Sequence, residues 1–256
     1  MDFSKLSYRS FVGKLARLPL RLIPKRAVLP ILQGQLRGKK WVVGAGNHSY
    51  WLGSYEMHKR QAFEREVKPG MVVFDIGANV GFYSLLAAVL TGQGGKVYAF
   101  EPSERNVKFI RQHAALNKIE TIVVIEAAVA EQNGVALFDP GTSIATGHLS
   151  ATGTVPVQQY SLDELFAAGE IQPPDAMKVD VEGAEYAVLK GAKRIIQDFL
   201  PIIFLDTHGR DVHEFALGFL TSHGYQFEIL DGKPLPDAKE LIARPPAGKF
   251  QRAEHK

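Results

Sequence analysis

Acidic residues follow four short apolar runs of this sequence, at positions where buried strands would end: Asp75, Glu101, Asp180 and Asp206. In a doubly wound sheet, ligands bind outside the carboxyl ends of the strands, so we expect these side chains to meet at one edge. Converging carboxylates repel an anionic ligand. The pattern therefore favours a ligand that is cationic or rich in hydroxyl groups.

A glycine-punctuated turn follows the first of these acids and reads Asp75-Ile76-Gly77-Ala78-Asn79-Val80-Gly81. Glycine has no side chain, so such a turn lets backbone N–H groups approach a ligand closely. A nicotinamide dinucleotide would require the spacing G-x-G-x-x-G and would bring its pyrophosphate near Asp75. The loop therefore favours S-adenosylmethionine, with Glu101 accepting hydrogen bonds from the ribose hydroxyls. An NAD-binding Rossmann protein is the less favoured alternative.

Strand and helix patterns alternate from Met71 onward, which is typical of βαβ units and a parallel sheet. The expected strands span 71–75, 96–101, 121–128, 177–180, 202–206, 225–230 and 240–243. The expected helices span 80–90, 103–117, 161–168, 184–199 and 212–223. Ser161 and Glu164 have the spacing of a capping box at the start of the third helix. Two short strands, 134–138 and 153–157, are expected around a loop, 139–152, that contains His148.

Composition excludes some kinds of chemistry. The chain has 256 residues and no cysteine, which rules out disulfides, zinc–thiolate sites and cysteine nucleophiles. Residues 1–40 hold ten Lys and Arg against Asp2 alone, a net charge of +9, so the remainder of this +3 chain carries −6. A basic arm on a mildly acidic body indicates surface attachment rather than a nucleic-acid-binding domain.

The basic arm has helical spacing of apolar residues at Tyr8, Phe11, Val12 and Leu15. This predicts a short basic amphipathic helix that either contacts an anionic membrane or packs on the main domain. We expect an arm and lid segment over 1–66, a cofactor-binding domain over 67–245 and a polar tail over 246–256. The expected location is cytoplasmic, with peripheral membrane contact as the alternative.

Three blocks of the sequence occur in a distinctive order. They are Phe74–Ser84, Phe100–Ser103 with Asn106, and Lys178–Glu185 with Leu189 and Gly191-Ala192. Together they resemble the FkbM family of methyltransferases, and Gly53–Glu56 resembles the segment that precedes the first block there. The resemblance covers about residues 41–245.

The resemblance implies an α/β protein with the class I methyltransferase fold. This fold is a Rossmann-like, seven-stranded, mostly parallel sheet with helices on both faces and the last strand antiparallel. The resemblance also implies S-adenosylmethionine as methyl donor. The implied reaction is O-methylation of a hydroxyl on a sugar, glycan or small secondary metabolite.

Carried over by position, the loop residues Asp75, Gly77, Ala78, Asn79 and Gly81 would hold the methionine part of the donor. Glu101 would bind the ribose. The residues expected to complete the cofactor pocket are Pro102, Ser103 and Asn106 around the ribose, Ala127 beside the adenine, and Glu56 near the amino-acid end.

Methyl transfer to oxygen requires alignment of donor and acceptor and removal or polarisation of the hydroxyl proton. The candidate groups are Asp180 and Glu182 at one strand tip and His208 after another. In one alternative, Asp180 and Asp206 share Mg²⁺ or another divalent cation that binds the hydroxyl. In the other, Asp180 or His208 acts as a base without metal. Glu185 is expected only to favour a helix N-terminus. A cofactor-binding module without catalysis is the hypothesis from another functional class.

Overall fold

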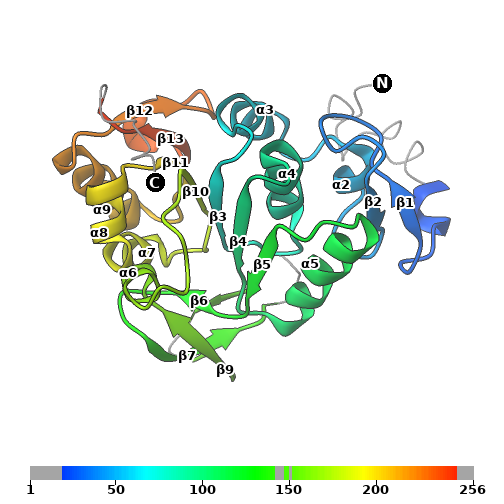
Figure 1. The fold of residues 1–256 in the computed structure, drawn as a ribbon, viewed down its shortest axis with the longest axis horizontal. Helices are drawn as coiled ribbons and strands as arrows, with labels where there is room; N and C mark the ends of the chain where they lie inside the picture. The colour runs from blue at the N-terminus through cyan, green and yellow to red at the C-terminus, as the bar shows by residue number, and fades with distance from the viewer. Residues whose placement is uncertain (1–18, 142–146, 150–151, 247–256) are drawn as a thin grey trace.

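The computed structural model describes residues 19–141, 147–149 and 152–246. Within these ranges a central sheet lies between two layers of helices (Figure 1). The predicted amphipathic helix around Tyr8–Leu15 lies outside the described residues. Most of the polar tail and part of the 139–152 loop lie outside them as well.

Seven strands form the central sheet. In spatial order they are β12 (Gln226–Ile229), β13 (Glu240–Arg244), β11 (Ile202–Asp206), β10 (Ala176–Val179), β3 (Val72–Ile76), β4 (Lys96–Phe100) and β5 (Ile122–Ile125). β13 pairs antiparallel with both β11 and β12, and the other neighbouring strands of this sheet pair in parallel. This confirms the expected seven-stranded, mostly parallel sheet. The strand order reverses between β3 and β10, which is where doubly wound sheets bind ligands.

Helices cover both faces of this sheet, as predicted. One face carries α2 (Ser49–Leu52), α3 (Met57–Glu66), α4 (Phe82–Thr91) and α5 (Glu104–Leu116). The other carries α6 (Leu162–Ala167), α7 (Glu185–Gly191), α8 (Lys193–Phe199) and α9 (Arg210–Ser222). Because side chains alternate along a strand, Val73 packs on the first face and Phe74 and Ile76 on the second.

A second, smaller sheet has the order β6 (Ala128–Val129), β9 (Val155–Tyr160), β7 (Gly134–Asp139) and β8 (His148–Leu149). The predicted strand over 121–128 is therefore two strands in different sheets. The chain breaks at Ala127, whose N–H donates to the Ile125 carbonyl at 2.9 Å. The two short strands predicted around the 139–152 loop are present as β7 and β9, and they pair with each other antiparallel.

The helix predicted over 184–199 is divided at Ala192, where φ is −114° and the backbone leaves the helical region. Gly191 lies against the backbone just after β6, where a Cβ on residue 191 would be 2.0 Å from the Ala130 carbonyl oxygen. One of the two hydrogen bonds of the predicted capping box is present, because Ser161 Oγ accepts from the Glu164 N–H at 3.4 Å. The Ser161 N–H donates to Asn133 Oδ1 at 2.8 Å instead of to Glu164.

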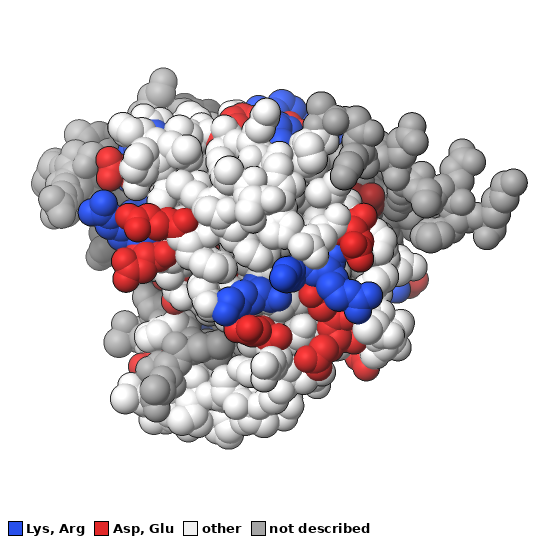
Figure 2. Space-filling model, turned by 90° about the vertical axis from the view of Figure 1, so that its left-hand side faces the viewer, with Lys and Arg blue, Asp and Glu red and all other residues white. Residues whose placement is uncertain are grey.

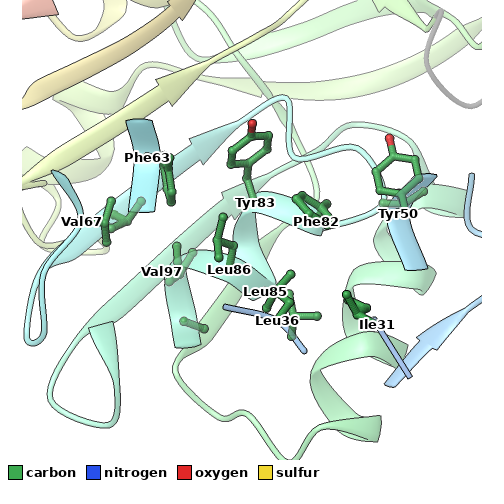
Figure 3. Close-up of a cluster of buried hydrophobic side chains, with 14 of the residues drawn as sticks. Ile31, Leu36, Tyr50, Phe63, Val67, Phe82, Tyr83, Leu85, Leu86 and Val97 are labelled. Atoms are coloured by element: carbon green, nitrogen blue, oxygen red, sulfur yellow. The ribbon is translucent and has the colours of Figure 1, made fainter. Parts of the chain in front are cut away.

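Residues before β3 pack in the same core as α4. A hairpin of β1 (Val28–Pro30) and β2 (Lys40–Val42) leads to α2 and α3. Phe63 of α3 contacts Tyr83 with ring centroids 5.2 Å apart, and Tyr50 of α2 contacts Phe82 at 5.6 Å (Figure 3). The hydroxyl of Tyr83 points out of this cluster, toward the polar side of the sheet edge (Figure 3).

Two 3₁₀ turns, η2 (Pro19–Leu22) and η3 (Leu235–Asp237), complete the described elements. Among the described helices none combines the length and apolar character needed to cross a bilayer. On the face shown in Figure 2, basic and acidic side chains lie beside one another rather than in patches of one sign. Arg244 binds Glu66 at 2.9 Å and Glu228 at 2.6 Å.

A buried histidine joins the β1–β2 hairpin to the main domain. His113 stacks on Trp41 with centroids 3.8 Å apart, and its Nε2 accepts from the Val42 N–H at 3.2 Å. Nδ1 must then carry the proton and donate to the Val80 carbonyl at 3.0 Å. Burial lowers the pKa of the His113 imidazole to about 4, although the Val80 hydrogen bond opposes that shift.

We predict that His113 contributes to loss of stability in acid. Its pKa is lower when folded than the ordinary 6.5, so the unfolded chain binds the proton first. The free energy of unfolding should decrease as the pH is lowered from about 6.5, and at pH 4 this one group should have reduced it by about 3 kcal/mol. Urea unfolding should show a shallower fall for His113→Gln than for wild type. The exposed His58→Gln should keep the wild-type slope, and parallel curves for wild type and His113→Gln would refute the assignment.

Candidate active site

A cavity of about 380 Å³ opens at the carboxyl ends of β3, β4, β10 and β11. This volume is in the range of small-molecule sites. The predicted site residues that line it are Glu56, Gly77, Ala78, Asn79, Glu101, Pro102, Asn106, Ala127, Asp180, Glu182, Asp206 and His208. The cavity therefore brings together the groups predicted for cofactor binding and those predicted for catalysis.

Three residues predicted to contact the cofactor do not line the cavity: Asp75, Gly81 and Ser103. Asp75 is 1% exposed because it shares a face of β3 with Val73 and points toward α4, where Ser84 Oγ donates to it at 2.6 Å. Gly81 packs on Ile110. Ser103 donates its backbone N–H to Glu101 at 3.0 Å, and its side chain makes no cap hydrogen bond.

The loop after β3 lies tightly between two strand ends. Gly77 has a φ of 75°, and a Cβ there would be 2.0 Å from the Asp180 carbonyl oxygen, so only glycine fits. The N–H groups of Gly77 and Ala78 both donate to the Phe100 carbonyl at 3.0 Å. Asn79 has a φ of 50°, and its Oδ1 is buried with no hydrogen-bond partner in the described part of the chain.

Glu101 is a buried carboxylate held by hydrogen-bond donors. It accepts from the Asn79 N–H at 2.8 Å, the Ser103 N–H at 3.0 Å and Asn106 Nδ2 at 3.2 Å. Burial raises the pKa of Glu101 to about 7, even though these hydrogen bonds oppose that shift. The carboxylate is 5% exposed and lines the cavity, so it suits a neutral ligand that donates hydroxyl hydrogens.

Two buried lysines lie among the acids at the other end of the cavity, and sequence reasoning assigned a role to neither. Lys178 Nζ lies 3.3 Å from Asp180 and 3.7 Å from Asp75. Lys59, from α3, forms ion pairs with Asp206 and, at 2.7 Å, with Glu56. Lys178 is the residue of β10 that pairs in register with Asp75. In the sequence, the signal for a role of Lys178 was its position as a charged residue inside an otherwise apolar strand.

These lysines stabilise the Asp180 charge. Burial raises the pKa of the Asp180 carboxyl, but the charges of Lys178 and Lys59 outweigh that effect and hold this pKa below its ordinary value. Lys59 Nζ lies 3.9 Å from Asp180. Asp180 is therefore ionised at neutral pH and is a weak base.

His208 lies at the cavity wall beside Asp180 and Glu182. Its Nε2 is 4.0 Å from Asp180 Oδ1 and 3.7 Å from Glu182 Oε2, and its Nδ1 contacts Glu185 Oε1 at 2.6 Å. A hydrogen bond to Glu185 raises the pKa of His208. Burial lowers this pKa, and the charges of the nearby carboxylates raise it further. Glu185 was expected only to favour a helix N-terminus, but it also contacts a candidate catalytic residue.

The predicted metal pair, Asp180 and Asp206, lines the cavity, and Lys59 Nζ lies within ion-pair distance of both carboxylates. Asp206 forms an ion pair with Lys59, whereas Asp180, Glu182 and His208 offer ligand atoms within 4.8 Å of one another. A divalent cation at this wall of the cavity would therefore have Asp180, Glu182 and His208 as its available ligands.

Strained backbone conformations are concentrated at this cavity. Among the described residues, five other than glycine have a positive φ, and three of them line it: Glu56 at 41°, Asn79 at 50° and Glu182 at 50°. Such conformations cost about 1–3 kcal/mol each and cluster at functional sites. They support a functional role for the cavity.

Comparison with known proteins identifies the family. The methyltransferase FkbM domain model matches residues 75–227. The 31-O-demethyl-FK506 methyltransferase FkbM of Streptomyces tacrolimicus is 36% identical over 224 residues, which cover 72% of this chain and 84% of that protein. Hexuronic acid methyltransferase AglP of Haloferax volcanii is 28% identical over 134 residues, 52% of this chain and only about half (54%) of that protein.

A solved structure supports the fold. The protein assigned as an rRNA methylase from Clostridium thermocellum superimposes with a TM-score of 0.51 at 13% identity, over 75% of this chain and 95% of that one. The sheet order described above is that of the class I methyltransferase fold. Fold, sequence blocks and family match agree: this chain belongs to the FkbM family of methyltransferases.

Proposed function

We propose that the protein is an S-adenosylmethionine-dependent O-methyltransferase whose acceptor is a hydroxyl on a sugar, glycan or small secondary metabolite. The observation that carries the proposal is a single cavity with a ribose-type carboxylate, Glu101, at one end and Asp180, Glu182 and His208 at the other. The names of two relatives, one for a hexuronic acid and one for 31-O-demethyl-FK506, support an oxygen acceptor on a metabolite.

The residues present fit this cofactor. Asn79 Oδ1 is a buried acceptor without a partner among the described residues, and Glu101 offers a carboxylate to a diol. Lysines pair with Glu56 and Asp180, but acids outnumber lysines in the cavity lining, and this excess of negative charge would stabilise an α-ammonium or sulfonium. When bound, S-adenosylmethionine supplies a methyl group that the acceptor oxygen attacks in line, while the C–S bonding pair departs with sulfur.

The chain's own groups handle the proton and the charge. His208 Nε2 accepts the proton of the acceptor hydroxyl, which makes the oxygen a better nucleophile. Asp180 and Glu182 stabilise the imidazolium that forms, since both lie within 4.0 Å of Nε2. Lys59 and Lys178 keep Asp180 ionised and fix its position.

We predict that affinity for S-adenosylmethionine depends on pH through Glu101. The carboxylate, with a pKa of about 7 in the free protein, accepts hydroxyl hydrogens better when ionised. The Kd measured by calorimetry should therefore fall by about tenfold from pH 6 to pH 8. Glu101→Gln should bind more weakly and lose most of this dependence. A variant that keeps the full wild-type slope would show that another group titrates.

Asp180→Asn is expected to lower kcat by about 10²-fold, because the neutral side chain no longer stabilises the protonated His208. The Kd for S-adenosylmethionine should change less than kcat, which is the pattern for a group that acts mainly in the transition state. A thermal melt checks that the isosteric variant is folded. An unchanged kcat would remove Asp180 from the mechanism.

We propose that the reaction proceeds without a divalent cation, since Lys59 already supplies positive charge to Asp206. Methyl transfer to a panel of sugar and polyketide alcohols should then be the same after treatment with EDTA. Loss of activity that Mg²⁺ restores would contradict this. It would favour an ion held by Asp180, Glu182 and His208, which are the ligand set within reach of one another.

A further inference from the structure

Glu185 is a buried carboxylate at the first position of α7. It has no exposed surface. Its Oε1 lies 2.6 Å from His208 Nδ1 and 3.3 Å from the Gly183 N–H. Its Oε2 is also buried, with no hydrogen-bond partner in the described part of the chain.

Stabilisation of a helix N-terminus does not explain this burial. A carboxylate interacts only weakly with a helix N-terminus and can do so from the surface. Burying a carboxylate is unfavourable unless a partner compensates the charge. Glu104 shows the ordinary arrangement: it begins α5, its side chain is 72% exposed, and it pairs with Lys108. His208 is the partner of Glu185: the neutral ring hydrogen-bonds to it, and the protonated ring compensates its charge.

The contact determines which nitrogen of His208 carries the proton. An ionised carboxylate only accepts hydrogen bonds, so Nδ1 must be the protonated nitrogen of the neutral ring. Nε2 then keeps its lone pair. Its nearest carboxylates, Asp180 and Glu182, are 4.0 and 3.7 Å away, beyond hydrogen-bond distance, so the lone pair is available to a ligand.

We propose that Glu185 is a positioning residue, which holds His208 as the Nδ1–H tautomer with Nε2 directed at the acceptor hydroxyl. The inference rests on the proposed methyl transfer to oxygen. As the C–O bond forms, the hydroxyl proton passes to Nε2, and the resulting imidazolium keeps its Nδ1–H bond to an ionised Glu185. The negative charges facing the ring are those of Glu185, Glu182 and Asp180. Lys59, Lys239 and Glu240 line the same cavity.

The unliganded wild-type protein provides the first test, because it requires neither donor nor acceptor. In ¹⁵N-histidine NMR, neutral His208 should be the Nδ1–H tautomer. An Nε2–H tautomer would overturn the proposal without bearing on whether the protein transfers methyl groups. Absence of methyl transfer by the wild type would overturn the proposed function without changing the tautomer.

The isosteric variant Glu185→Gln provides the second test. Loss of the charge should lower the pKa of His208, so the NMR titration and the acid limb of kcat/KM should move together to lower pH. The maximal kcat should fall by about 10-fold or more, because the imidazolium loses its buried counter-charge. A purely structural role would lower the thermal midpoint and leave both pH profiles unchanged. Glu104→Gln, which also removes an acid from a helix start, should leave them unchanged in any case.

A double variant tests whether Glu185 acts through His208. In a His208→Gln background, Glu185→Gln should cause no further loss of kcat, because the group that it positions is absent. An additive loss would show that Glu185 acts by another route and would overturn the proposal.

Discussion

The structure depends on compensating the negative charge that its topology brings to one sheet edge. Asp180 follows β10, Asp206 is the last residue of the adjacent parallel strand β11, and Glu56, at the N-terminus of α3, lines the same cavity. Carboxylates so close together and largely removed from water are costly without counter-charges. Lys59 and Lys178 supply those charges from opposite directions, one from the covering helix and one from within the sheet. The position of α3 over the sheet is therefore tied to the site's electrostatics as well as to the contact of Phe63 with Tyr83.

The alternation of side chains along the strands decides the role of each acid. Asp75 and Lys178 are register partners on the α4 side, one residue before their strands end, so they form an ion pair there; Lys178 lines the cavity, whereas Asp75 does not. Asp180 lies just beyond the end of β10 and reaches the cavity. Glu101, just beyond β4, does the same at the other end. A difference of one or two residues along a strand thus separates a supporting carboxylate from one that can contact a ligand.

The order of the longer strands and helices from β3 to β13 could be predicted because each apolar run and each helical pattern is local, whereas the β5–β6 and α7–α8 breaks and the short β8 were missed. Glu101, Asp180 and His208, which directly follow strands, could be predicted for the same reason. α3 could not be predicted in this way, since its buried face includes Lys59 and Arg60 and so lacks an apolar stripe. The role of Lys59 depends on Asp206, 147 residues away, and that of Glu185 depends on His208, 23 residues away. Such partners become visible only once the strands are placed side by side.

Lys59 also bears on where the folding unit of this chain begins and ends. The family match spans residues 75–227, so α3 and β13 both lie outside it. A fragment cut to those limits would leave Asp206 without its ion-pair partner. It would also leave β11 as an edge strand that pairs only with β10, because β13 is its other neighbour in the sheet. An exposed apolar edge strand is a template for pairing with another chain. The smallest fragment that keeps the site therefore extends from the α2–α3 segment to the end of β13, well beyond the residues that define the family.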